Sequence, residues 1–291
     1  MMLKDTLLEA CQKDFKTSSA GHCGDNCNNH ENCSHDCNSC LDQVHWYPQY
    51  GGRSDYSCPN LLLAYILRFS EKYSQQIRHA LSFIDTTMYP FFNIFSIGCG
   101  ATPDLMAFEE VAKEKNIYYR GFDRNELWEN IHTQIESYAK LSNNLQVDLT
   151  CADIFDVLTP EAAATTKYNV ITIQYLLSHL FNTEQQARIS WLFDQLINCI
   201  IKHSDPDIPF LIIITDIDSC NKGRNTWFSL LDKLESAGYS GHAIAQSAYP
   251  TGDLGQDRWS HHKQSDCFGN IRYEYLHSNE HDCAQLIIEL R

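Results

Sequence analysis

Residues Ile94–Asp104 have the sequence IFSIGCGATPD, and this stretch decides the fold. The apolar run 93–97 predicts a buried strand, which ends at the Gly-Cys-Gly turn of residues 98–100. A helix is expected to follow, with Thr102 at its N-cap and Pro103 at its first position. Two glycines around one small residue let the backbone bend sharply against a flat ligand, and the helix N-terminus offers free N–H groups to an anion. The stretch is typical of a parallel α/β sheet that holds a nucleotide-like cofactor.

Two carboxylates follow the next two expected strands. The run 117–122 predicts a second strand and ends in Asp123, where a carboxylate can accept both hydroxyl groups of a ribose. The run 145–152 predicts a third strand and ends in Asp153, which is placed to meet the edge of an adenine. An ordinary turn after an apolar strand would explain the two glycines but not both acids at strand ends.

This order of motifs resembles that of the class I S-adenosylmethionine-dependent methyltransferases, over roughly the last two thirds of the chain. The resemblance implies a Rossmann-like α/β sheet, mostly parallel with an antiparallel C-terminal edge. It also implies that the glycine turn lies under the methionine part of S-adenosylmethionine, that Asp123 binds the ribose, and that Asp153 binds the adenine amino group. The residues expected at the cofactor are Gly98, Cys99, Gly100, Asp104, Asp123, Arg124, Asp153, Ile154, Gln174 and Tyr175.

A dinucleotide such as NAD is the main alternative cofactor. The dinucleotide fingerprint needs Gly or Ala three positions after Gly100, and this chain has Pro103 there. A second mononucleotide-binding half is also missing from the sequence pattern. The sequence therefore favours the methyl donor.

Composition indicates a globular protein. The chain has 291 residues, 43% of them apolar, which suffices for a full hydrophobic core. No run of about 18 apolar residues is present, and the N-terminus lacks the apolar core of a signal peptide. We therefore expect a cytoplasmic protein with no membrane partner.

The charge balance argues against a nucleic acid as the partner. Lys and Arg total 22 against 37 Asp and Glu, which gives a net charge of −15. Phosphate contacts dominate nucleic-acid affinity, and no lysine- or arginine-rich segment interrupts the acidity. We expect the unknown acceptor to be a small molecule, a peptide or a protein.

Thirteen cysteines in a chain expected in the cytoplasm are not typical of disulfides. Six of them crowd into residues 23–58, and the segment 21–40 has few residues that could form a core. A structural zinc ion would supply the missing stabilisation, because thiolate coordination can provide folding energy by itself. The expected ligands are Cys33, Cys37, Cys40 and Cys58, and the alternatives are Cys23, Cys27, His22, His30, His35 and His45.

The chain is expected to divide into two parts. Residues 1–90 are predicted to form the Cys-rich metal-binding segment with its covering helices, and residues 91–291 the S-adenosylmethionine-binding methyltransferase domain. An amphipathic helix is expected over 60–85, where it could cover the cofactor as helices before the first strand often do in the resembled family. The aromatic loop 45–56 is expected either to form part of a lid or to pack the zinc unit onto the main domain.

Further strands are expected at 168–173, 210–215, 243–248, 271–276 and 284–290. The last two are expected to form an antiparallel pair at the sheet edge. A helix is expected over 183–203, beginning with a capping box made by Thr183 and Gln186.

The sequence leaves the acceptor and any general base open. The segment Gln174–His179 lacks the Asn/Asp-Pro-Pro-aromatic motif of the DNA amino-methyltransferases, which disfavours exocyclic amines of bases as acceptors. Tyr175 and Trp259 could stack on an acceptor. The residues that could act as a general base are His179, Asp216, His261 and His262. Each of these residue types is more often a packing or surface residue.

Three functions follow from these patterns. The first is a methyltransferase that acts on a small molecule, peptide or protein. The second is a zinc-containing RNA or DNA methyltransferase whose N-terminal unit docks the nucleic acid. The third is a non-catalytic interaction protein that retains the methyltransferase fold.

Overall fold

The three-dimensional structure is a computed structural model, and it describes residues 2–15, 37–45, 56, 58–112, 114–159, 166–183, 185–218, 226–247, 268, 272–275 and 283–291. Of the expected zinc ligands, Cys33 lies outside these residues. So do most of the aromatic loop 45–56, Trp259 and the pair His261–His262.

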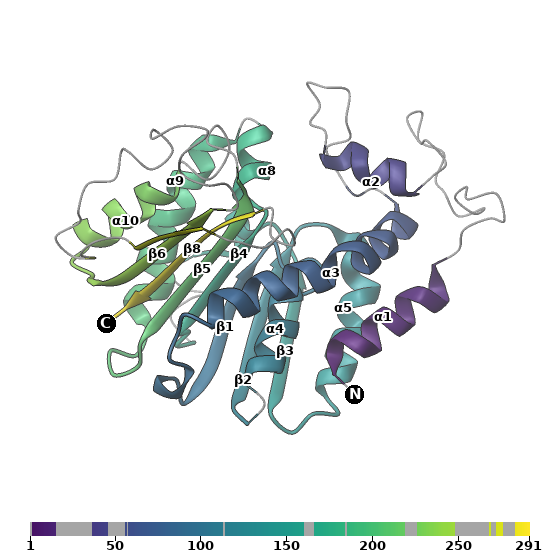
Figure 1. Ribbon diagram of the computed structural model, residues 1–291, viewed down its shortest axis with the longest axis horizontal. Helices are drawn as coiled ribbons and strands as arrows, with labels where there is room; N and C mark the ends of the chain where they lie inside the picture. Colours follow the sequence, from purple (N-terminus) through teal and green to yellow (C-terminus); the bar gives the residue numbers. More distant parts are fainter. Residues whose placement is uncertain are drawn as a thin grey trace.

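The described strands form one eight-stranded sheet in the order β3-β2-β1-β4-β5-β8-β6-β7 (Figure 1). The five strands from β3 to β5 pair in parallel, and β8 is antiparallel to β5 and to β6. The predicted mostly parallel sheet with an antiparallel C-terminal part is therefore confirmed. The strands are β1 Phe91–Ile97, β2 Asn116–Asp123, β3 Leu145–Cys151, β4 Val170–Gln174, β5 Phe210–Ile217, β6 Gly241–Ser247, β7 Arg272–Tyr275 and β8 Cys283–Leu290.

The predicted pairing of the last two strands is wrong. Strand β8 lies between β5 and β6, whereas β7 pairs in parallel with β6 at the edge of the sheet. Seven of the eight residues of β8 are buried, on both faces of the strand. Burial of both faces is typical of interior strands of α/β sheets, whose two faces are covered by helices.

Helices cover both faces of the sheet. One face carries α1 Leu3–Asp14, α3 Pro59–Leu81, α4 Pro103–Val111 and α5 Glu129–Ala139, and the other carries α8 Leu177–Asn182, α9 Gln186–Gln195 and α10 Trp227–Ser236. Shorter elements are α2 Cys37–His45, α6 Ile154–Val157, the 3-10 helices Thr86–Met88, Glu126–Trp128 and Ile201–His203, and a π-helical turn Leu196–Ile200.

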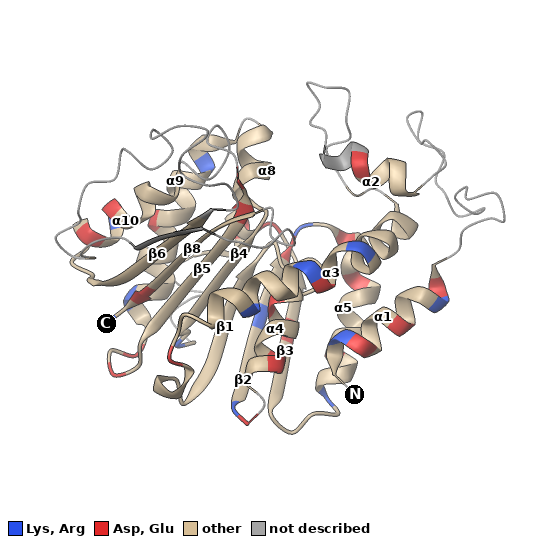
Figure 2. Ribbon diagram, viewed as in Figure 1, with Lys and Arg blue, Asp and Glu red and all other residues tan. Residues whose placement is uncertain are grey.

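The two hydrophobic cores follow from the alternation of side chains along the central strands. In β5, Phe210, Ile212 and Ile214 pack with the α9 and α10 face, while Leu211 and Ile213 pack with the α3 and α4 face. Figure 2 shows charged residues mainly on the helices and loops, with the central strands largely free of them. The continuous apolar run of β5 is what a strand buried on both faces requires.

The N-terminal helices α1 and α3 pack on the main sheet body. Leu3, Leu7 and Cys11 of α1 belong to the same core as Ile94 of β1. The 23-residue helix α3 contacts α1, α4 and β5, and Figure 1 shows it crossing one face of the sheet. Among the described helices, none combines the length and the hydropathy that crossing a membrane requires.

The predicted capping box at Thr183 does not form. The Thr183 hydroxyl donates to the backbone oxygen of His179, 2.8 Å away, so it lies at the end of α8. Helix α9 begins later, with Gln185 at the N-cap and no side-chain cap bond. From Gln186 the chain stays helical to His203, through α9, the π-helical turn and the last 3-10 helix. The helix expected over 183–203 is therefore confirmed apart from its first residues.

The approach of β6 to β8 makes a specific prediction at Gly241. A Cβ atom there would lie 2.0 Å from the backbone oxygen of Glu289, which cannot move without breaking the β6–β8 pairing. We expect Gly241→Ala to lower the free energy of unfolding by about 3 kcal/mol or more, as severe overpacking does.

The matched control is Gly238→Ala, because a Cβ atom there meets nothing within 4 Å and the only cost is the positive φ of 87°. Its expected cost is about 1–2 kcal/mol. Urea unfolding of both variants measures the difference, and equal losses would contradict this description of the β6–β8 contact.

Candidate functional site

A cavity lies over the carboxyl ends of the parallel strands. Its position is the point where the strand order reverses. Strand β1 pairs with β2 on one side and with β4 on the other, and the cavity of about 670 Å³ opens above them. Open α/β sheets bind ligands at such a switch point. A volume of this size is in the range of sites for small molecules and cofactors.

The glycine turn forms the floor of this cavity. Gly98 and Gly100 have φ angles of +67° and +48°, in the left-handed region that favours glycine. The N–H groups of Gly98 and Cys99 both donate to the backbone oxygen of Phe122, at 2.8 and 3.1 Å, which fastens the turn to β2. Thr102 occupies the N-cap position of α4, as predicted, but its side chain makes no cap hydrogen bond.

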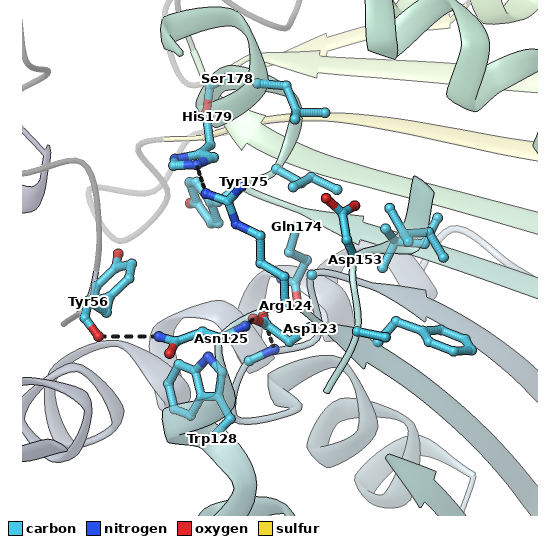
Figure 3. A pocket seen from close by; sticks show the side chains of 18 of the residues that line it. Tyr56, Asp123, Arg124, Asn125, Trp128, Asp153, Gln174, Tyr175, Ser178 and His179 are labelled. Atoms are coloured by element: carbon cyan, nitrogen blue, oxygen red, sulfur yellow. Dashed lines mark hydrogen bonds between the residues drawn. The ribbon is translucent and has the colours of Figure 1, made fainter. Parts of the chain in front are cut away.

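Asp123 fixes the other side of the turn. Its Oδ2 accepts a hydrogen bond from the N–H of Gly100 at 3.1 Å, and its Oδ1 accepts one from the N–H of Asn125 at 2.9 Å (Figure 3). Desolvation raises the pKa of Asp123, and these two hydrogen bonds oppose the rise. Each carboxylate oxygen has a further lone pair, so Asp123 can still accept from ligand hydroxyl groups.

Two residues that the sequence did not single out as ligand-site residues hold the turn from below. His132 donates from Nε2 to the backbone oxygen of Gly100, at 2.9 Å, and its ring is nearly parallel to that of Trp128. Desolvation lowers the pKa of His132, so the ring is neutral and Nδ1 is an acceptor. Trp128 lies against Gly100, 3.5 Å from where a Cβ atom would be. Neither contact has a motif that would reveal it in the sequence.

Cys99 and Asp104, both expected at the cofactor, lie beneath the turn and do not line the large cavity. Asp104 is buried and accepts hydrogen bonds from the hydroxyl groups of Ser96, Thr172 and Tyr119. Cys99 is also buried, with its sulfur facing Gly121. Both border a much smaller cavity of about 20 Å³ behind the turn. Their side chains are thus placed to support the turn.

Asp153 lies at the far end of the cavity, where it caps a short helix and pairs with an arginine. Its Oδ1 accepts from the N–H of Phe155 at 3.0 Å, and its Oδ2 lies 3.2 Å from Nη2 of Arg188. The Arg188 guanidinium stacks 3.6 Å from the centre of the Phe155 ring. The sequence did not indicate Arg188, because it comes from α9, far from Asp153 along the chain.

Gln174 and Tyr175 at the end of β4 meet an aromatic wall from α3. The rings of Tyr175 and Tyr73 are 4.3 Å apart, and the Tyr175 hydroxyl donates to Oε1 of Gln76 at 3.0 Å. Tyr65 adds a third ring, 6.0 Å from that of Tyr73. This confirms that a helix before the first strand contributes to the wall of the cavity.

Arg124 and His179 meet across the cavity. Nη2 of Arg124 lies 3.3 Å from Nε2 of His179, and Figure 3 shows the arginine reaching from the end of β2 toward α8. Desolvation and the charge of Arg124 lower the pKa of His179, so the imidazole is neutral. A guanidinium only donates, so Nε2 is the acceptor and the ring hydrogen is on Nδ1. In this arrangement the lone pair that a general base needs is already engaged.

Asp216, the second candidate base, does not line the cavity. It is fully buried at the end of β5 and accepts from the N–H of Ser178 at 2.9 Å, which holds the start of α8. Desolvation raises its pKa to about 6. Its position makes it a support for the segment that carries His179.

The three described cysteines of the predicted zinc site do not form one. Among the described residues, no group of three or more His, Cys, Asp or Glu side chains is placed to hold a metal ion. Cys37 and Cys40 belong to helix α2 instead of a metal-binding turn, and the Cys37 sulfur accepts from Nδ2 of Asn60 at 3.3 Å. With Cys58 they are buried beside Leu41 and Leu61.

The structure brings most of the expected cofactor residues to one cavity. Tyr56, Trp128 and His179 also line this cavity. The expected residues that line it are Gly98, Gly100, Asp123, Arg124, Asp153, Ile154, Gln174 and Tyr175.

The sequence matches no known protein family and no curated protein. Among solved structures, the chain is similar to the plantazolicin methyltransferase BpumL, in complex with a triazolic desmethylPZN analogue and S-adenosylhomocysteine (SAH). The identity is 11% over 88% of this chain and 98% of that one, with a TM-score of 0.49. It is also similar to a SAM-dependent methyltransferase from Archaeoglobus fulgidus, with 13% identity over 77% of this chain and 99% of that one and a TM-score of 0.43.

The buried carboxyl of Asp216 predicts a pH dependence of stability. Its pKa rises on folding from 3.8 to about 6, so the folded state binds its proton more tightly than the unfolded state does. The stabilisation is complete below about pH 4 and is lost as the pH rises through 6. Asp216→Asn removes this titration. The stability of the variant relative to wild type should therefore rise by roughly 2–3 kcal/mol between pH 4 and pH 7. Urea unfolding at several pH values measures this, and parallel curves for the two proteins would refute it.

Proposed function

We propose that this chain is a methyltransferase that takes the methyl group of S-adenosylmethionine and transfers it to a small molecule, a peptide or a protein. The observation that carries the proposal is the position of Asp123. Its carboxylate lines the cavity at the switch point and is bonded to the N–H of Gly100, so a ribose-binding acid and the glycine turn form one rigid unit. The resemblance of the motif order adds to this support.

The residues around the cavity fit the donor in charge and in shape. Gly98 and Gly100 leave the floor free of side chains, so a ligand can lie against the backbone. Asp123 offers acceptors for hydroxyl groups, and Asp153 offers an acceptor for an amino group at the opposite end. Gly98, Gln174 and Tyr175 then face the methionine part of the donor, which carries the methyl group, so the acceptor must arrive beside them. When bound, the donor supplies an electrophilic methyl group.

The chain contributes mainly by position and exclusion of water in this proposal. Methyl transfer is an in-line displacement, and holding both reactants in line accounts for much of the acceleration. The Tyr65, Tyr73 and Tyr175 rings wall off one side of the cavity with little polar surface. His179, neutral and bonded to Arg124, is the imidazole placed nearest to an incoming acceptor in the described part of the cavity.

The strand order favours this function over NAD binding. The dinucleotide fold continues beyond its fifth strand with a sixth parallel strand, which completes the second nucleotide-binding half. Here the strand next to β5 is β8, and it is antiparallel. The net charge of −15 likewise disfavours the second function, an RNA or DNA methyltransferase.

Binding of SAH to wild type and to Asp123→Asn tests the proposal. Asparagine removes the charged acceptor, and hydrogen bonds to charged groups contribute about 1.5–3 kcal/mol each, so the affinity should fall about 10–100-fold. Isothermal titration calorimetry gives both constants. The matched control is Asp148→Asn, because Asp148 is 62% exposed on the neighbouring strand and pairs with Arg120. It should bind as wild type does.

Other outcomes of this titration decide between the candidate functions. Wild-type chain that is folded and binds NAD but not SAH would refute the proposal. Chain that binds neither would favour a non-catalytic interaction protein. Chain that binds SAH together with RNA or DNA at low salt would favour the nucleic-acid acceptor, since electrostatic contacts are strongest there.

Zinc binding stays a proposal that the sequence alone supports, through Cys33, Cys37, Cys40 and Cys58. If it is correct, the purified full chain holds about one equivalent of zinc, and Cys37→Ser releases it, because loss of one thiolate opens a tetrahedral site. Elemental analysis by mass spectrometry measures this. Cys199→Ser, which changes a buried cysteine in the main sheet body, is the control. Chain purified without chelators and free of zinc would refute the site.

A further inference from the structure

The backbone of Tyr175 is in a conformation that costs free energy. Its φ angle is +55°, and among the described non-glycine residues only Thr102 shares a positive φ. A left-handed backbone is unfavourable for a residue with a side chain. Such a residue persists only when its surroundings hold it, and these residues cluster at ligand sites.

Three contacts hold Tyr175 in this conformation. Its N–H donates to the backbone oxygen of Thr215 at 2.8 Å, and its ring stacks on Tyr73. Its hydroxyl donates to Oε1 of Gln76, a fully buried residue of α3. The direction of the side chain therefore depends on Gln76.

Gln76 is in turn held by a row of polar residues on the sheet. In register on the neighbouring strands β4, β5, β8 and β6 lie Gln174, Thr215, Gln285 and Gln246. They share the face that α3 covers, since directly opposed residues point to the same side of a sheet. Nε2 of Gln285 donates to the backbone oxygen of Gln76 at 2.8 Å and lies 3.0 Å from the Thr215 hydroxyl.

This arrangement is unfavourable for stability compared with an apolar one. Gln76 and Gln285 are 0% exposed, and the Nε2 atom of Gln76 and the Oε1 atom of Gln285 find no hydrogen-bond partner among the described residues. Buried amide groups without a partner cost free energy that a leucine or methionine would avoid. What the two glutamines do achieve is to fix Tyr175 and the segment of α3 that carries Tyr73.

We propose that Gln76 and Gln285 are positioning residues of the ligand cavity, which hold the Tyr175 ring over the glycine turn. Tyr175, Tyr73 and Gly98 border both the large cavity and the small one behind the turn. The inference rests on the proposed function, in which this part of the cavity receives the amino-acid part of the donor. The two glutamines act on that part alone, because the adenosine part is assigned to Asp123 and Asp153.

Two related compounds separate this role from a general structural one. SAH carries the amino-acid part, and 5′-methylthioadenosine lacks it. We expect Gln76→Met and Gln285→Leu each to weaken SAH binding about tenfold, corresponding to one lost hydrogen bond in the holding network. Binding of 5′-methylthioadenosine should change less than twofold, and the melting temperature should stay the same or rise. Calorimetry on the full chain measures both affinities.

The control and a double mutant test the route through Tyr175. Gln75→Met changes the neighbouring glutamine, which is bonded to Glu71 on the outer side of α3, and should leave both affinities unchanged. In a Tyr175→Phe background, Gln76→Met should have little further effect on SAH binding, because the bond that it removes is already absent.

Each remaining outcome overturns a defined claim. If the wild-type chain binds SAH and the variants bind both compounds as wild type does, this inference is overturned and the proposed function stands. A parallel loss of both affinities in the variants, with a lower melting temperature, assigns the glutamines a structural role and also overturns it. Folded wild-type chain that binds neither compound overturns the proposed function and this inference with it.

Discussion

The pairing of β1 with β2 on one side and β4 on the other is the constraint on which the site depends. Because the strand order reverses at β1, the helices that follow β1 and β4 pass to opposite faces of the sheet. The carboxyl ends of these two strands are thus left uncovered, and a cavity forms between them. Residues from the ends of five strands, separated by up to 120 positions between Ile97 of β1 and Ile217 of β5, meet there only because of this order.

The buried acids of this region are held by N–H and O–H donors more than by cations. Asp123 is bonded to two backbone N–H groups, and Asp104 to three side-chain hydroxyl groups. Asp216 is bonded to the backbone N–H of Ser178. Asp153 alone among these four pairs with an arginine. Uncharged donors orient a carboxylate without neutralising it, so the Asp123 carboxylate can meet ligand hydroxyl groups in a cavity that Arg124 and Arg188 also line.

Local patterns in the sequence predicted the elements but not all of their partners. The alternation and length of the apolar runs indicated β1 to β5 and the long helix α3, because burial on one or both faces leaves a periodic trace. The strand ends Asp123, Asp153 and Tyr175 could be located for the same reason, since a strand end fixes which residue reaches the cavity.

Contacts between distant segments left no such trace. Strand β8 lies between β5 and β6, and neither β7 (RYEY) nor β8 (CAQLIIEL) carries a motif that identifies its neighbours. The bonds of His132 to Gly100 and of Arg188 to Asp153 join residues 32 and 35 positions apart with no motif. The spacing of the cysteines is ambiguous for a related reason, because Cys-x-x-Cys fits one turn of a helix as well as a metal-binding turn, and Cys37 and Cys40 lie in α2.

The antiparallel direction of β8 explains how the C-terminal part of the chain reaches the cavity. A parallel strand beside β5 would place its last residues at the cavity edge. An antiparallel strand places its first residues there instead, so Cys283, Ala284 and Gln285 lie opposite the end of β5. Gln285 then reaches the backbone oxygen of Gln76, 209 positions earlier in the chain, and links β8 to α3. The antiparallel strand β8 therefore supplies a side chain that supports the wall of the cavity.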